Sequence, residues 1–207
     1  MSRLPWTPKV MLLAVGSLCF LQCMIRRATI DTYVDANYGP GVVHKVAIFP
    51  IVNARLAASE AQQINRKVST EIHRKNPGIL IMSSAEATQI LNEHSLASDW
   101  ATFLNNYVSS GVPDATVLSR IGRTLGVDAI IQGELVNIFQ QDGAFGLGKG
   151  TTRVTVRFSM LGVEDGKLLW EASSDGIIIM KRVFDPAPAV IDAVRLAVDK
   201  IIQQLPF

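Results

Sequence analysis

The stretch VTVRFSMLGVEDGKLLWEASSDG, residues 154–176, decides the fold. Its first part alternates polar with apolar residues, which is the pattern of a strand with one buried and one wet face. Asp165-Gly166 supplies the residue pair of a tight hairpin turn, and Leu168–Ser174 returns as the partner strand, with Ile177–Met180 as its extension. The second half of the chain therefore predicts an antiparallel hairpin. The apolar positions of its first strand are Val154, Val156, Phe158 and Met160.

The loop before this hairpin, QDGAFGLGKGTT (residues 141–152), has the glycine and lysine spacing of a nucleotide-binding loop. A phosphate cradle leads from a strand into a helix, whose N-terminal N–H groups bind the phosphate. Here a strand follows Lys149, and Gly150 stands where a magnesium-binding Ser or Thr is required. We therefore expect no nucleotide, and instead a mobile glycine loop whose contact residues are Phe145 and Leu147.

The first half of the chain predicts βα units. Residues 44–52 and 79–82 are short apolar strands, a helix at 57–74 joins them, and residues 127–139 form a third strand. Ser84 and Asp114 are expected N-caps, and Gly126 is an expected C-cap. Three helices fill residues 84–126, and a last helix covers 188–204. The stripe from Trp100 to Tyr107 fits core packing better than a partner-binding helix.

The expected fold class is therefore α/β. Residues 44–207 should form a single domain of two or three layers. Its mixed sheet has about five strands, with βα units first and a C-terminal antiparallel hairpin, and helices pack on it.

The N-terminus predicts export. Arg3 and Lys9 precede the apolar run Val10–Gln22, which is the order of a secretory signal peptide. Extended to Ile25, the run has 16 residues, fewer than the roughly 20 that a spanning helix needs. We assign residues 1–22 to a signal peptide and 23–43 to a lipidated tether with little apolar periodicity.

The two cysteines, Cys19 and Cys23, lie in or directly after this run, so the domain has no disulfide framework. A cysteine that ends an apolar signal suggests lipid attachment in a bacterial lipoprotein. Cys23 is the first choice because it ends the run, and Cys19 is the second because small residues precede it. The alternative is an ordinary signal or an uncleaved anchor.

Other chemistry has little support. A net charge of +2 without a basic tract argues against nucleic-acid binding. His44, His73 and His94 lie in different elements, so we expect no metal site and no cofactor. Two alternatives remain for the polar residues of the strands. Glu134 and Glu171 could form a carboxylate pair, and Arg153 and Arg157 could form a binding surface, but the sequence favours an ordinary solvated sheet face for both. Without a nucleophile motif either, we expect no enzyme and assign no catalytic residue.

The order of the segments KVAIFPIVN, ILIMSSAEATQIL, LGVDAIIQGEL and VTVRFSMLGVEDGKLLWEASSDG resembles a group of bacterial envelope lipoproteins with a TolB N-terminal-like fold. The group includes the curli-secretion channel lipoprotein CsgG and the penicillin-binding-protein activator LpoB. The resemblance covers about residues 44–204. It implies a periplasm-facing domain that is lipid-anchored in the outer membrane and acts through protein contacts.

The resemblance predicts an accessory or assembly factor of a cell-envelope machine, with the membrane and an envelope protein as partners. The alternative is a subunit of an oligomeric secretion or export apparatus, a homo-oligomeric ring without its own membrane barrel. The strand connections at 140–151 and at Asp165-Gly166 are too short for barrel hairpins, whose strands need roughly 9–11 residues each.

Overall fold

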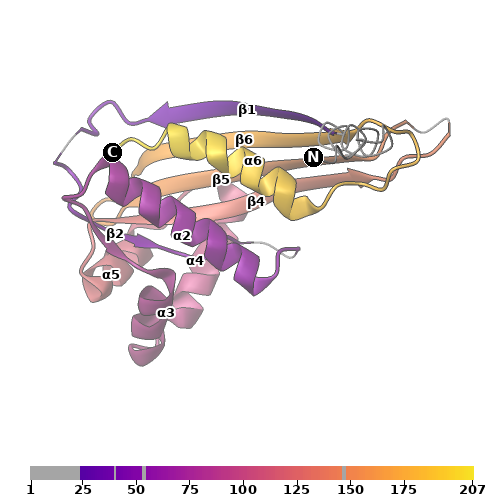
Figure 1. The fold of residues 1–207 in the computed structure, drawn as a ribbon. Coiled ribbons are helices and arrows are strands. Elements are labelled where there is room, and N and C mark those ends of the chain that lie inside the picture. Colours follow the sequence, from indigo (N-terminus) through magenta and orange to yellow (C-terminus); the bar gives the residue numbers. More distant parts are fainter. Residues whose placement is uncertain (1–23, 40, 53–54, 146–147) are drawn as a thin grey trace, which may run out of the picture.

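The computed structural model describes residues 24–39, 41–52, 55–145 and 148–207. Within these ranges the chain forms one mixed sheet of six strands with helices on both faces (Figure 1). The α/β fold class is confirmed. In chain order the elements are β1 (Met24–Val34), β2 (Lys45–Ile48), α2 (Ala58–Lys75), β3 (Leu80–Met82), α3 (Ser84–Glu93), α4 (Ala97–Ser110), α5 (Ala115–Leu125), β4 (Ala129–Gln141), β5 (Thr151–Gly162), β6 (Leu168–Met180) and α6 (Val190–Gln203).

The strand order is β1-β6-β5-β4-β2-β3. β2 is parallel to both β3 and β4, as βα units require, whereas the pairs β4–β5, β5–β6 and β6–β1 are antiparallel. The predicted change from βα units to an antiparallel hairpin is therefore confirmed. The Asp165-Gly166 turn joins β5 to β6, and β6 runs without interruption through Ile177–Met180.

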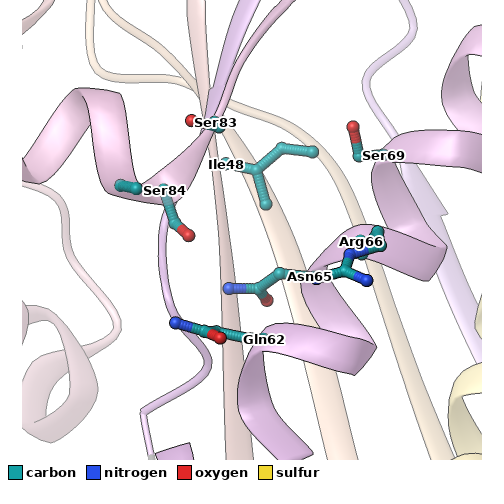
Figure 2. Close-up of a pocket in the computed structure, with 8 residues that line it drawn as sticks. Ile48, Gln62, Asn65, Arg66, Ser69, Ser83 and Ser84 are labelled. Atoms are coloured by element: carbon teal, nitrogen blue, oxygen red, sulfur yellow. The ribbon is translucent and has the colours of Figure 1, made fainter. Parts of the chain in front are cut away.

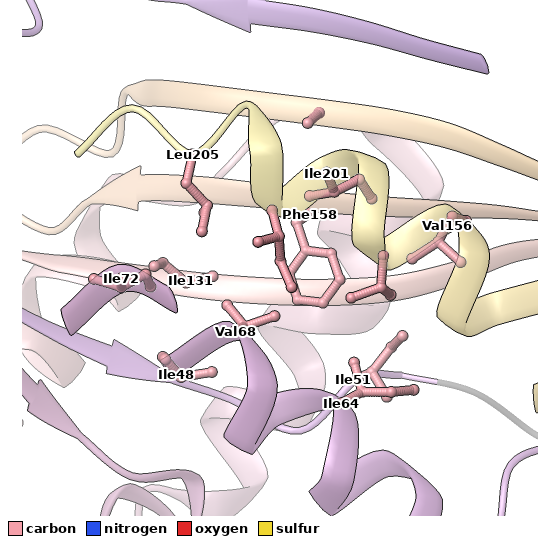
Figure 3. Close-up of a cluster of buried hydrophobic side chains, with 14 of the residues drawn as sticks. Ile48, Ile51, Ile64, Val68, Ile72, Ile131, Val156, Phe158, Ile201 and Leu205 are labelled. Carbon is pink, nitrogen blue, oxygen red and sulfur yellow. The ribbon is translucent and has the colours of Figure 1, made fainter. Parts of the chain in front are cut away.

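The first face of the sheet packs against α2 and α6 (Figure 3). The four apolar residues of β5 that alternate with polar ones in the sequence, Val154 to Met160, point to this side, and the ring of Phe158 is 1% exposed. Helix α2 contributes its i, i+4, i+8 stripe, and α6 lies over β5 and β6. This cluster forms the larger part of the core. Its helix residues include Ile64, Val68, Ile72, Val194, Val198 and Ile201.

The second face packs against α3, α4 and α5 around β2 and the first half of β4. Phe49 and Trp100 have ring centroids 4.1 Å apart, and Phe103 and Tyr107 continue the stack at 5.3 and 5.9 Å. All four side chains are buried. The aromatic stripe of α4 is therefore core, as the sequence favours.

Two of the three expected helix caps are confirmed. Asp114 Oδ1 accepts hydrogen bonds from the N–H groups of Thr116 and Val117, and Gly126 ends α5 with φ of 60°. The N-cap of α3 is Ser83 and not Ser84, because the Ser83 hydroxyl accepts the Glu86 N–H at 3.2 Å.

The expected tether over residues 23–43 is wrong for Met24–Val34, which form β1. This strand pairs with β6 along its whole length, from Met24↔Met180 to Val34↔Trp170. It raises the number of strands to six, against the expected five or so. Only Ala28 and Ile30 of β1 are half-buried, and its other residues are exposed. Because an edge strand of this kind buries so little, its sequence does not alternate between polar and apolar residues.

Candidate functional site

A large part of the second face of the sheet is covered by no helix within the described part of the chain. We call this area, formed by β1, β6, most of β5 and the second half of β4, the open face. Helices α3–α5 cover the rest of this face. The border between the two areas lies where Tyr107, in the last turn of α4, stands beside Ser159 of β5. Burial raises the pKa of Tyr107 above its usual value, since the phenolate would lose water.

The polar side chains in the middle of the open face pair with one another. Each pair joins residues directly opposite on neighbouring strands, where side chains stand closest. Such pairs satisfy the half-buried polar groups of a sheet. They are Arg157 Nη2 to Glu134 Oε2 at 2.6 Å, Ser159 Oγ to Glu171 Oε2 at 2.9 Å and Thr155 Oγ1 to Asp175 Oδ1 at 2.7 Å.

Glu134 and Glu171 therefore do not form a carboxylate pair. They lie on β4 and β6 with β5 between them, about 10 Å apart by the spacing of strands. Burial alone would lower the pKa of Arg157, but the hydrogen bond and charge of Glu134 raise it above its usual value. Arg157 thus stays charged and neutralises Glu134. Arg153 lies further along β5 and is exposed.

Strand β1 forms one edge of the sheet. The Asp35 N–H donates to the Leu169 carbonyl at 3.0 Å and continues the β1–β6 register, so odd-numbered residues bond to β6. Inward and outward groups alternate in an antiparallel ladder. The even-numbered residues therefore present their N–H and C=O groups outward, where no further strand lies within the described ranges. These are Met24, Arg26, Ala28, Ile30, Thr32 and Val34.

One end of the sheet brings together the start of β1, the end of β4, the start of β5 and the end of β6. We call this end, with residues 24–27, 141–145, 148–151 and 179–189, the tip (Figure 1). The Gly143 N–H donates to the Asp185 carbonyl at 3.0 Å, and Asp142 Oδ1 accepts the Ala187 N–H at 2.8 Å. The two loops of the tip are thus bonded to each other.

Glycines in the tip allow this close packing. A Cβ on Gly143 would lie 1.9 Å from the Val183 carbonyl oxygen, and one on Gly150 would lie 2.4 Å from that of Asp185. Only glycine fits such an approach between backbones. No helix follows Lys149, because β5 begins at Thr151, so the nucleotide-cradle geometry is not formed.

Phe145 is 89% exposed at the tip, as a contact residue has to be. Leu147, Cys19 and Cys23 lie outside the described residues. Phe184, in the connection from β6 to α6, is 75% exposed on the same tip. Sequence reasoning missed Phe184 because Lys181–Ala189 carries no periodic pattern. A phenylalanine in such a segment was the available signal.

A hollow of about 340 Å³ lies between α2 and the start of α3 (Figure 2). The side chains of Gln62, Asn65 and Ser84 converge on it, and the buried Asn65 Oδ1 has no hydrogen-bond partner there. Its lining holds no histidine or carboxylate that could activate a serine. The negative charge of Glu86, in the first turn of α3, would also repel an anion bound at that helix end. The described residues around the hollow therefore form no catalytic constellation.

Among the described residues, no group of three or more His, Cys, Asp and Glu side chains is arranged to hold a metal ion. His44 precedes β2, His73 lies in the last turn of α2 and His94 caps α3. None of the described helices is both long and apolar enough for a membrane span.

No family model matches the chain, and no curated protein matches it in sequence. Three solved structures resemble this chain in fold, each at 13% sequence identity. The PelC dodecamer from Paraburkholderia phytofirmans matches 85% of this chain and 95% of its own, with a TM-score of 0.46. Lipoprotein GNA1162 from Neisseria meningitidis matches 78% and 99%, also at 0.46. The LpoB C-terminal domain from Escherichia coli matches 69% and 87%, at 0.39. Likenesses of this size carry no information on the function of the chain.

Proposed function

We propose that the chain is a lipid-anchored, periplasm-facing lipoprotein of the outer membrane that serves a cell-envelope machine as a non-enzymatic accessory or assembly factor. Its contact with a protein partner runs through the edge strand β1. The observation that carries this proposal is the length and exposure of that edge.

Exposed edges are normally blocked, because their free N–H and C=O groups pair with any strand that approaches. β1 has 11 residues, no proline and an unbroken register with β6. The stretch of β1 from Ala28 to Val34 holds a single charge, Asp31. Such an edge suits the addition of a partner strand, in which main-chain hydrogen bonds give affinity and side chains give specificity.

The position of β1 also supports the anchor. The strand begins at Met24, one residue after Cys23. A lipid on Cys23 would hold the domain against the membrane without a flexible tether, and the partner edge would rise directly from the bilayer. On the open face, Arg157 neutralises Glu134, which favours a structural role for that carboxylate over a catalytic one.

Replacing Ala28 by proline tests the edge. Ala28 directs its N–H outward, so the substitution removes a donor that β6 does not use, and edge positions of this kind tolerate proline. We expect the thermal midpoint to fall by no more than about 2–4 °C, which corresponds to about 1 kcal/mol. Contact with the partner should be lost. A photo-crosslinking residue at Thr32 in intact cells measures that contact.

Thr29→Pro is the matched control. The backbone N–H of Thr29 bonds to β6, so the loss of this donor should destabilise the fold. Two results contradict the proposal: no adduct from Thr32 in the parent protein, or an adduct that Ala28→Pro leaves unchanged.

A further inference from the structure

The tip gathers exposed apolar side chains. All three exposed phenylalanines of the described residues lie at or near it: Phe145 at 89%, Phe184 at 75% and Phe139 at 48%, the last on β4 close to that strand's end. Met24 and Ile25, which are 42% and 38% exposed, lie at the same end of the sheet, at the start of β1. Monomeric proteins seldom expose grouped aromatic residues without a binding role.

The tip is also cationic. It holds five basic side chains and two carboxylates. One of these carboxylates, Asp142, is engaged by the Ala187 N–H. The basic residues are exposed and form no ion pair within the described part of the chain. They are Arg26, Arg27, Lys149, Lys181 and Arg182.

Apolar rings surrounded by Lys and Arg are the composition of surfaces that enter the headgroup layer of a bilayer. The rings displace water at the acyl boundary, while each cation near an anionic surface contributes about 1 kcal/mol. Hydrogen bonds between the two loops hold the segments that carry Phe145 and Phe184 side by side, which reduces the ordering needed on contact.

We propose that the tip is a membrane-docking surface that inserts Phe145 and Phe184 into the headgroup region of an anionic phospholipid bilayer. The inference rests on the proposed function for its location. Cys23, the proposed site of lipid attachment, directly precedes Met24 in the sequence, so the anchor joins the described chain at this tip. The sheet then stands with its strands rising from the membrane, and the free edge of β1 and the open face project away from it.

The test is a fluorescence measurement on the full-length lipidated protein in vesicles. Phe145→Trp places an indole at the tip. The control Val112→Trp places one at a 70% exposed site in the connection from α4 to α5, at the opposite end of the sheet. The emission of the parent protein is subtracted. With brominated lipids we expect loss of most of the added emission at position 145 and none at position 112.

A second variant tests the charges. In the Phe145→Trp protein, Lys181→Glu with Arg182→Glu should reduce quenching in vesicles that contain an anionic phospholipid and leave it unchanged in neutral vesicles. An equal reduction of quenching in anionic and in neutral vesicles would overturn the proposal that the basic residues of the tip bind anionic lipid.

The outcomes separate the two proposals. Protein that floats with the vesicles but shows no quenching at position 145 overturns the docking surface and leaves the lipid anchor intact. Equal quenching at positions 145 and 112 also overturns it. Protein that does not float overturns both.

Discussion

Replacing Phe158 by alanine is expected to lower the free energy of unfolding by about 3–5 kcal/mol. The ring is 1% exposed in the cluster between the sheet, α2 and α6. It also lies over Gly133, its partner on β4, where an added Cβ would come within 2.7 Å of Phe158 Cε1. Gly133 has no side chain to fill the space, so the cavity stays open. Thermal unfolding of the detergent-solubilised protein should show a midpoint lower by about 10 °C.

Phe139→Ala is the matched control for this prediction. Phe139 lies on the neighbouring strand β4 and is 48% exposed, so its removal leaves no cavity. We expect a change of less than about 1 kcal/mol. Equal effects at the two positions would contradict the placement of the core on the first face.

Gly176→Ala is expected to lower the free energy of unfolding by about 3 kcal/mol or more. Gly176 lies on β6 beneath α6, and a Cβ there would stand 2.1 Å from the carbonyl oxygen of Ala193. The obstacle is helix backbone, which cannot rotate away as a side chain can, so α6 must rise from β5 and β6. The midpoint should fall by about 6–12 °C.

Gly39→Ala provides the comparison, since no atom lies within 4 Å of the added Cβ. Its effect should be near zero or slightly stabilising, because alanine restricts the unfolded chain. A Gly176→Ala protein that unfolds with the parent would show that α6 does not pack closely on β6.

The elements that could be predicted from sequence are those whose environment imposes a pattern. β5 lies between a packed face and a wet one, so its alternation is visible, and α5 has both its N-cap and its C-cap glycine. β1 has neither signal. It does contain Ile25, Thr29, Ile30, Thr32, Tyr33 and Val34, residues of high strand propensity. Propensity without periodicity was too weak to identify the strand.

The surfaces were less predictable than the fold. Phe145 could be proposed because its glycine loop is conspicuous. Its neighbour Phe184 comes from a segment 39 residues later and meets the loop only through tertiary hydrogen bonds. Likewise, Glu134 and Glu171 looked like a potential pair until register placed Arg157 opposite Glu134. Contacts between distant segments decide both cases, and no local pattern contains them.

Incorporation of labelled palmitate in cells tests the lipid anchor most directly. We predict label on the parent protein and on Cys19→Ala, and none on Cys23→Ala, because Cys23 directly precedes β1. Absence of label from the parent protein, or label that survives Cys23→Ala, would contradict a lipoprotein held to the membrane at the start of its edge strand.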